Sequence, residues 1–325
     1  MKEKKKLLWI DNLRGFLILL VILGHCIQNT NSNYQSDILF CYIYSFHMPL
    51  FIFVSGYVSY KEKVEWISLR KRFFQLIVPF SVWTCISAIS SLNVSVIIDD
   101  ILHPEKGLWF LWALFFISVI NTLCCRISYK TSTSEELINI IAATVLIITM
   151  RKFSYFCYPT IAKFFLFYIG GFFIRKHSMY FARYSKFIIA PSLFLFVISA
   201  YFFQWGDMPS FMKVGVSSFY GVVYNICVAV FAIVGFMELF KSYFDGHLII
   251  SKMGGRTLGM YAIHRPIMSL LPIGFINANE PLFYYIAIIV LWVVVSSLSY
   301  YAVLLIDKNR YLSFLLNGKR IKRIK

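Results

Sequence analysis

Residues 11–25 read Asp11-Asn-Leu-Arg14-Gly-Phe-Leu-Ile-Leu-Leu-Val-Ile-Leu-Gly-His25 and follow a basic N-terminus. With its apolar continuation to residue 29, this run predicts a membrane-spanning helix. Arg14 and His25 are eleven residues apart, about 20° from three full turns, so both side chains share one face about 16 Å apart along the axis. Ionisable groups inside a span cost free energy, and two on one face indicate a functional site. The structural alternatives are that Arg14 reaches the lipid headgroups and that His25 is a hydrogen-bonded packing residue.

The composition is that of a membrane protein. The 325 residues are 59% hydrophobic, 19% aromatic and only 14% charged, with a mean hydropathy of +0.70, which excludes an ordinary soluble domain. A net charge of +17 would favour a nucleic-acid partner in a soluble protein, but here it indicates basic loops that face anionic lipid, and we expect no nucleic acid. The seven cysteines have no metal-ligand spacing, so we expect neither a metal nor a bound cofactor.

Ten apolar segments of helical length follow one another along the chain. They lie at about 13–29, 38–60, 74–91, 107–125, 137–150, 160–174, 187–204, 216–240, 257–273 and 282–306. We therefore predict an all-α protein, a polytopic integral membrane bundle of about ten transmembrane helices. It forms a single domain over residues 1–325, with a short basic tail from about residue 307.

The basic residues are distributed unequally between the two sides of this bundle. The segments placed inside carry 25 lysines and arginines, whereas the outer loops carry 4. Because cytoplasmic loops are enriched in these residues, we expect both termini to be cytoplasmic. The predicted location is the cytoplasmic membrane of the cell.

Two further segments place histidines in spans. The second span contains Ser45-Phe-His47-Met-Pro49, in which the proline removes a backbone hydrogen bond beside His47, although an interfacial histidine is an equal alternative. The ninth span begins with Thr257, and Tyr261 and His264 follow at the helical spacing i+4 and i+7. These three residues form one polar stripe, which indicates function more than packing.

A basic cluster stands at the cytoplasmic start of the third span. It reads Arg70-Lys71-Arg72. Most such clusters only set membrane topology, but this one is placed to meet phosphate groups at the inner face of the membrane.

These segments together resemble the acyltransferase-3 family of integral membrane acyltransferases, in the branch related to fucose 4-O-acetylases. The chain departs from the family's basic pattern at Gln75, where a second arginine is usual. The resemblance extends from residue 9 to residue 266. The matching pieces are Trp9-Ile-Asp11-Asn-Leu-Arg14-Gly15 with His25, Phe46-His47-Met-Pro-Leu-Phe-Ile-Phe-Val-Ser55-Gly56, Leu108-Trp109-Phe110-Leu111, and Gly254-Gly-Arg256-Thr-Leu-Gly-Met-Tyr261-Ala-Ile-His264.

The resemblance implies transfer of an acyl group, most often acetyl, from acyl-CoA to a hydroxyl of a surface carbohydrate or its lipid-linked precursor. Acyl-CoA is then a co-substrate, and the partners are the carbohydrate or glycolipid acceptor and membrane lipid. Arg14 suits a CoA phosphate because guanidinium matches phosphate geometry, and Asp11, three residues earlier, is placed to orient it. Arg70 and Arg72 are further candidates for donor binding.

The catalytic candidate is His25, because a sugar hydroxyl is a weak nucleophile and imidazole is a suitable base near neutral pH. His47, Tyr261 and His264 are candidates for acceptor binding or for stabilising the oxyanion. Whether His25 acts on the hydroxyl directly or through an acylated enzyme is left open by the sequence.

Two other classes of protein fit the hydropathy. A proton-coupled transporter or flippase of a sugar or glycolipid would use the same histidines as a proton relay, although no repeated half is present in the sequence. A non-catalytic membrane subunit fits less well, because it has no need for charge on the face of its first span.

Overall fold

The computed structural model describes residues 7–60, 66–150, 152–178, 186–202, 219–271, 276 and 281–319, and the regular elements in these ranges are helices. They form two compact units that are each discontinuous in sequence. The first unit comprises Met1–Phe51 and Met179–Val303, and the second comprises Ile52–Ser178 and Leu304–Lys325. The all-α prediction is confirmed, and the prediction of a single domain over residues 1–325 stays a prediction.

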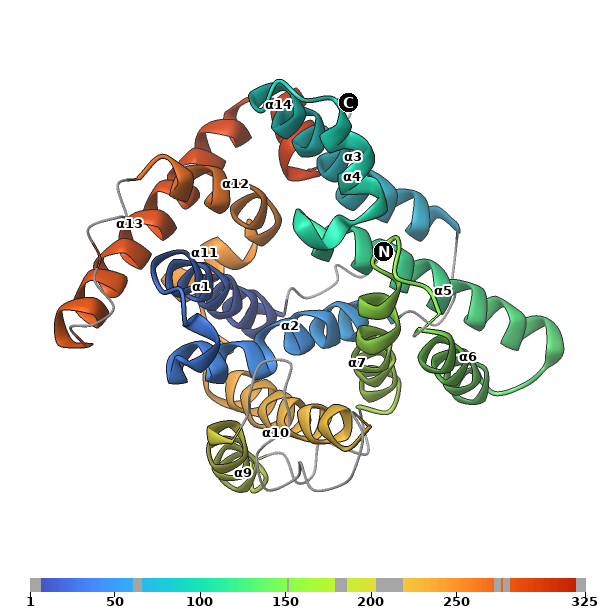
Figure 1. Ribbon diagram of the computed structural model, residues 1–325. Helices are drawn as coiled ribbons and strands as arrows, with labels where there is room; N and C mark the ends of the chain where they lie inside the picture. Colours follow the sequence, from blue (N-terminus) through green and yellow to red (C-terminus); the bar gives the residue numbers. More distant parts are fainter. Residues whose placement is uncertain are drawn as a thin grey trace. The chain divides into compact units, whose positions relative to one another are not determined.

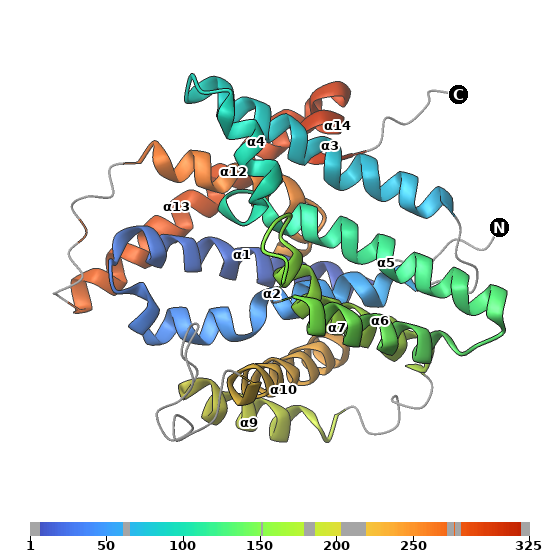
Figure 2. The same ribbon diagram turned by 45° about the vertical axis from the view of Figure 1, so that its right-hand side comes forward.

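The first unit is built around α1, which contacts α10, α11 and α12 (Figures 1 and 2). Glycines make this close packing possible: a Cβ on Gly15 would lie 2.1 Å from the carbonyl oxygen of Ile250, and a Cβ on Gly254 would lie 1.8 Å from that of Asp11. Small residues of this kind let helix backbones approach each other in membrane proteins. The helices of this unit are α1 (Leu8–Thr30), the first part of α2 (Ile38–Ser59), α9 (Ile189–Tyr201), α10 (Phe219–Tyr243), α11 (Ile249–Gly254), α12 (Thr257–Ser269) and most of α13 (Pro281–Lys308).

The second unit packs α5 against α3, α6 and α7, while α14 lies on α3 (Figures 1 and 2). The later part of α2 joins α7 through a second glycine contact, because a Cβ on Gly56 would lie 1.9 Å from the carbonyl oxygen of Tyr168. The helices of this unit are α3 (Trp66–Ser90), α4 (Ser95–Leu102), α5 (Trp109–Thr131), α6 (Glu135–Thr149), α7 (Tyr158–Lys176) and α14 (Arg310–Asn317).

Each of the ten predicted spans coincides with a helix. Among the described residues, six helices are long and apolar enough to cross a membrane: α1, α2, α3, α5, α10 and α13. The chain is thus an integral membrane protein, and the number of ten crossings stays a prediction. So does the orientation of the termini, since the basic segment 2–6 and most of the loop near 275–280 lie outside the described residues.

Three short helices were not predicted: α4, α11 and α14. The segment after residue 307, which we expected to be a short basic tail, contains α14. The side chain of Asn309 caps this helix by accepting hydrogen bonds from the backbone N–H groups of Tyr311 and Leu312. The sequence signal for α14 is weak because two turns of helix offer little periodicity.

Candidate functional site

The structure brings His25 of α1 and His264 of α12 together. Their ring centroids are 5.0 Å apart and the ring planes make an angle of 35°. His264 is fully buried, and His25 is half-buried. Two imidazoles from segments far apart in the sequence therefore face each other at the contact between α1 and α12.

Hydrogen bonds at the Nδ1 atoms determine what the two imidazoles offer to a ligand. Nδ1 of His25 lies 2.8 Å from Oε1 of Gln28, and Nδ1 of His264 lies 3.2 Å from the carbonyl oxygen of Met260. The side-chain amide oxygen of Gln28 and the backbone carbonyl oxygen of Met260 can only accept hydrogen bonds. Each neutral imidazole therefore carries its proton on Nδ1 and its lone pair on Nε2. Nε2 of His264 is buried and has no hydrogen-bond partner. A buried polar atom without a partner is costly and marks a place where a bound group can be recognised.

Tyr44 of α2 extends the cluster to the third histidine. Its ring lies 4.7 Å from that of His47 and 6.5 Å from that of His25, both edge-on. Gly24 makes room for Tyr44, because a Cβ at that position would lie 2.6 Å from the tyrosine ring. His47 is buried among protein atoms, at 2% exposure.

Tyr261 completes the group, with its ring 6.0 Å from that of His264. Thus the four residues predicted for catalysis or acceptor binding, His25, His47, Tyr261 and His264, lie in one cluster. We call this cluster, together with Tyr44, the histidine cluster. Its roles in chemistry stay predictions.

Asp11 and Arg14 lie near the opposite end of α1, and Arg14, eleven residues before His25, is about 16 Å from it by the rise of the helix. Asp11 is buried and Arg14 is half-buried. The neighbouring Asn12 is fully buried and holds the connection between α10 and α11, because its amide donates to the carbonyl oxygens of Phe244 (2.7 Å) and Gly246 (2.8 Å). This end of α1 is therefore fixed against the segment that leads into α12.

Arg70 and Arg72 belong to the second unit, and their side chains lie against different aromatic rings. The guanidinium carbon of Arg70 lies 5.9 Å from the ring of Phe74, and that of Arg72 lies 5.7 Å from the ring of Tyr168 on α7. Two positions along a helix turn the side chain by about 200°, which accounts for the different neighbours. Their joint action with Arg14 stays a prediction.

Sequence reasoning missed Gln28, Tyr44 and Asn12. Gln28 is three residues after His25, and Tyr44 is three residues before His47, so the helical spacing could have identified both. Asn12 carried no such signal, because its partners are backbone carbonyls more than 230 residues away.

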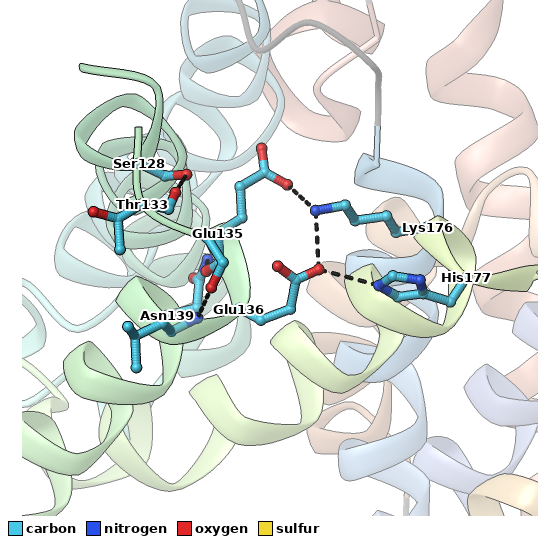
Figure 3. Close-up of polar contacts among 9 residues, drawn as sticks. Ser128, Thr133, Glu135, Glu136, Asn139, Lys176 and His177 are labelled. Atoms are coloured by element: carbon cyan, nitrogen blue, oxygen red, sulfur yellow. Dashed lines mark hydrogen bonds and ion pairs between the residues drawn. The ribbon is translucent and has the colours of Figure 1, made fainter. Parts of the chain in front are cut away.

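A second polar cluster joins α6 to α7 in the second unit (Figure 3). Lys176 lies 2.8 Å from Glu135 and 2.9 Å from Glu136, and His177 lies 3.1 Å from Glu136. Burial alone would raise the pKa of Glu136, but the hydrogen bonds from Lys176 and His177 prevail and lower it to about 2. Burial opposes the charged form of Lys176, yet the two carboxylates raise its pKa. The cluster is an ion-paired connection between two helix ends.

Comparison with known proteins matches nearly the whole chain to one family. The model of the acyltransferase-3 family, described as an acyltransferase domain, matches residues 7–301. Two proteins with the name Nodulation protein NolL are similar to the chain: that of Sinorhizobium fredii is 27% identical over 45% of this chain and 46% of its own length. That of Mesorhizobium japonicum is 30% identical over 45% of this chain and 44% of its own length. The chain therefore matches less than half of each relative, and no solved structure matches it.

Proposed function

The chain belongs to the acyltransferase-3 family, and we propose on this basis that it is a membrane O-acyltransferase. It moves an acyl group, most often acetyl, from acyl-CoA to a hydroxyl of a surface carbohydrate or its lipid-linked precursor. The observation that carries the proposal is the pairing of His25 with His264 inside a family member, at 5.0 Å and with Nε2 of His264 buried and unpartnered.

His25 is the base in this reaction. With Gln28 holding its Nδ1, Nε2 of His25 takes the proton of the acceptor hydroxyl while the hydroxyl oxygen attacks the thioester carbonyl. The tetrahedral intermediate then expels the CoA thiolate, and the imidazolium returns the proton to that sulfur. The products are the acyl ester and free CoA, so atoms and charge balance without a further reactant.

His264 binds the acceptor in this account. Its Nδ1 is occupied by the carbonyl oxygen of Met260, so the neutral ring presents a lone pair and accepts a hydrogen bond from a sugar hydroxyl. This arrangement favours acceptor binding over oxyanion stabilisation, since an oxyanion requires a donor. Tyr44, His47 and Tyr261 supply the aromatic and polar surroundings that sugar sites commonly use.

The donor extends from the other end of α1. Arg14 binds a phosphate of CoA, and the pantetheine arm, which is on the order of 16 Å long, brings the thioester to His25. Asp11 orients Arg14, and Arg70 and Arg72 contribute further positive charge at the inner face.

The second candidate function is a proton-coupled transporter of a sugar or glycolipid. The three histidines of the cluster would suit it as a proton relay. The two functions differ in product and in energy source. An acyltransferase leaves an ester on its acceptor and needs no gradient, because the thioester drives the reaction. A transporter moves an unmodified substrate and stops when the gradient is dissipated.

Analysis of the host's surface glycan by mass spectrometry and proton NMR, with and without this protein, separates these functions. We expect one ester-linked acyl group per modified sugar in its presence, none in its absence, and a reduced level of esterification in a strain that carries His264→Ala. His103→Ala serves as the matched control, because this partly exposed histidine lies outside the histidine cluster. A glycan that is exported but never esterified would favour the transporter.

A further inference from the structure

The C-terminal helix α14 is docked along α3 within the second unit (Figures 1 and 2). The ring of Phe314 lies 5.9 Å from that of Phe74, and the indole N–H of Trp83 donates to the carbonyl oxygen of Leu316 at 3.1 Å. The distribution of basic residues predicts that the start of α3 and the segment after residue 307 lie on the same side of the membrane.

The end of α14 meets α3 at a break in its backbone hydrogen bonding. Pro79 lies inside α3 and has no N–H to donate to the carbonyl oxygen of Gln75, four residues earlier. Gly318 packs against this carbonyl: a Cβ on Gly318 would lie 2.3 Å from the Gln75 oxygen. Gly318 also has a φ of +62°, which favours glycine. Both the backbone angle and the close approach therefore require glycine here.

Asp307 at the end of α13 holds α14 in this position. One oxygen of its carboxylate accepts hydrogen bonds from Ser313 (2.8 Å) and Asn317 (3.0 Å), and the other forms an ion pair with Lys319. Four residues thus fix the turn between α13 and α14. A connection held by so many hydrogen bonds has one defined geometry, so α14 presents the same face to α3 each time.

The contact continues from α14 to the basic cluster of α3. The ring of Phe74 contacts Phe314 on α14. It also lies beneath the guanidinium of Arg70 on α3, with 5.9 Å between the guanidinium carbon and the ring centroid. An arginine over an aromatic ring gains a modest attraction that restricts its side chain, and the ring itself is held by Phe314. We propose that α14 is a positioning element for the phosphate-binding end of α3, with Phe314 acting through Phe74 on Arg70.

This inference rests on the proposed function, because it assumes that Arg70 contacts a phosphate group of acyl-CoA. Phe314 touches neither donor nor acceptor in this arrangement. Its effect should therefore appear in donor affinity and not in the chemical step. A purely structural role would instead lower the amount of folded enzyme without changing the KM of what remains.

The test is a double-mutant cycle on the full chain, purified in detergent, with CoA binding measured by isothermal titration and the KM of acetyl-CoA measured by turnover. We expect Phe314→Ala to raise the Kd of CoA and the KM of acetyl-CoA about two- to fivefold, with kcat within about twofold of wild type. Phe314→Tyr keeps the ring and should restore wild-type values. Leu315→Ala, an exposed neighbour on the same helix, is the matched control.

The cycle with Arg70→Ala decides the mechanism. If Phe314 acts through Arg70, Phe314→Ala should have no further effect on donor affinity once Arg70 is removed. Penalties that simply add would overturn the proposal, as would an unchanged KM in a Phe314→Ala variant. Gly318→Ala is a second variant that should separate α14 from α3. Hydrogen exchange should show that α14 has lost protection, and the KM of acetyl-CoA should rise. An unchanged KM in this variant would also overturn the proposal. Failure of the wild-type chain to bind CoA at all would instead contradict the proposed function.

Discussion

Gly254→Ala is the substitution that most directly tests the packing of α1 against α11. The new methyl group would lie 1.8 Å from the carbonyl oxygen of Asp11 and 2.6 Å from its carbonyl carbon. Both contacts are to backbone, so neither can be relieved by a side-chain rotation. Ordinary carbon–oxygen contacts need well over 3 Å, and we estimate that the helices would separate by about 1.5 Å.

The separation should reach the histidine cluster because α12 begins at Thr257, three residues after Gly254. Overpacking of this size costs about 1–3 kcal/mol of stability. A misplacement of about 1 Å can reduce turnover about 100-fold even when it originates outside the site. We therefore expect Gly254→Ala to be folded, with a lower Tm, and to retain on the order of 1% of wild-type acyl transfer.

The neighbouring glycine supplies the control. A Cβ on Gly255 would meet nothing closer than 3.9 Å, and its φ of −74° suits alanine. Gly255→Ala should therefore keep nearly full turnover and Tm in the same detergent. If Gly254→Ala retains more than half of wild-type activity, or if both variants lose activity equally, the reasoning from the α1–α11 contact is refuted.

Substitutions at three further positions test the site and the ion-paired connection between α6 and α7. Arg14→Lys keeps the charge but loses the planar fork, so titration with a non-hydrolysable acyl-CoA analogue should show weaker binding, and weaker still for Arg14→Ala; unchanged affinity in both would remove Arg14 from the donor site. Gln28→Leu removes the oxygen that fixes the His25 tautomer, and kcat should fall about tenfold with little change in Tm, whereas an unaffected kcat would contradict the assignment. The folded-state pKa of Glu136 lies near 2, below its ordinary value of 4.5, so its ion pair with Lys176 stabilises the fold above about pH 4.5 and is lost as the pH falls towards 2. Tm measured between pH 5 and 3 should therefore fall less steeply for Glu136→Gln than for wild type, and equal slopes would contradict this role.

The sequence predicted helices and their order well, because long apolar segments have few alternatives in a membrane. The histidine cluster was anticipated only as separate residues. Helical spacing placed Tyr261 and His264 on one stripe, but nothing in the sequence showed that this stripe would meet His25. That meeting depends on glycine contacts between α1 and α11, which involve carbonyl oxygens and leave no pattern in side-chain types.

Other features could not be predicted for a similar reason. Helix α14 is short, and its position depends on the carbonyl of Gln75 that Pro79 leaves without a donor. Arg70 and Arg72 were grouped by proximity in sequence, although helical geometry turns them toward different neighbours. The partner of Arg70, Phe74, lies on the same helix, whereas that of Arg72, Tyr168, comes from α7, more than 90 residues away in the chain, and local spacing carries no information on it.

The central claim is that His25 is the base of a gradient-independent acyl transfer. Wild-type protein and His25→Ala, reconstituted in liposomes with a dissipating ionophore, should be given acetyl-CoA and glycan extracted from the host's surface. We predict that wild type releases free CoA faster when the glycan is added and leaves one ester on it. His25→Ala should be slower by about 100- to 10,000-fold while keeping its fold. Retention of more than about a tenth of wild-type turnover by His25→Ala, or ester formation that requires a proton gradient, would contradict the claim.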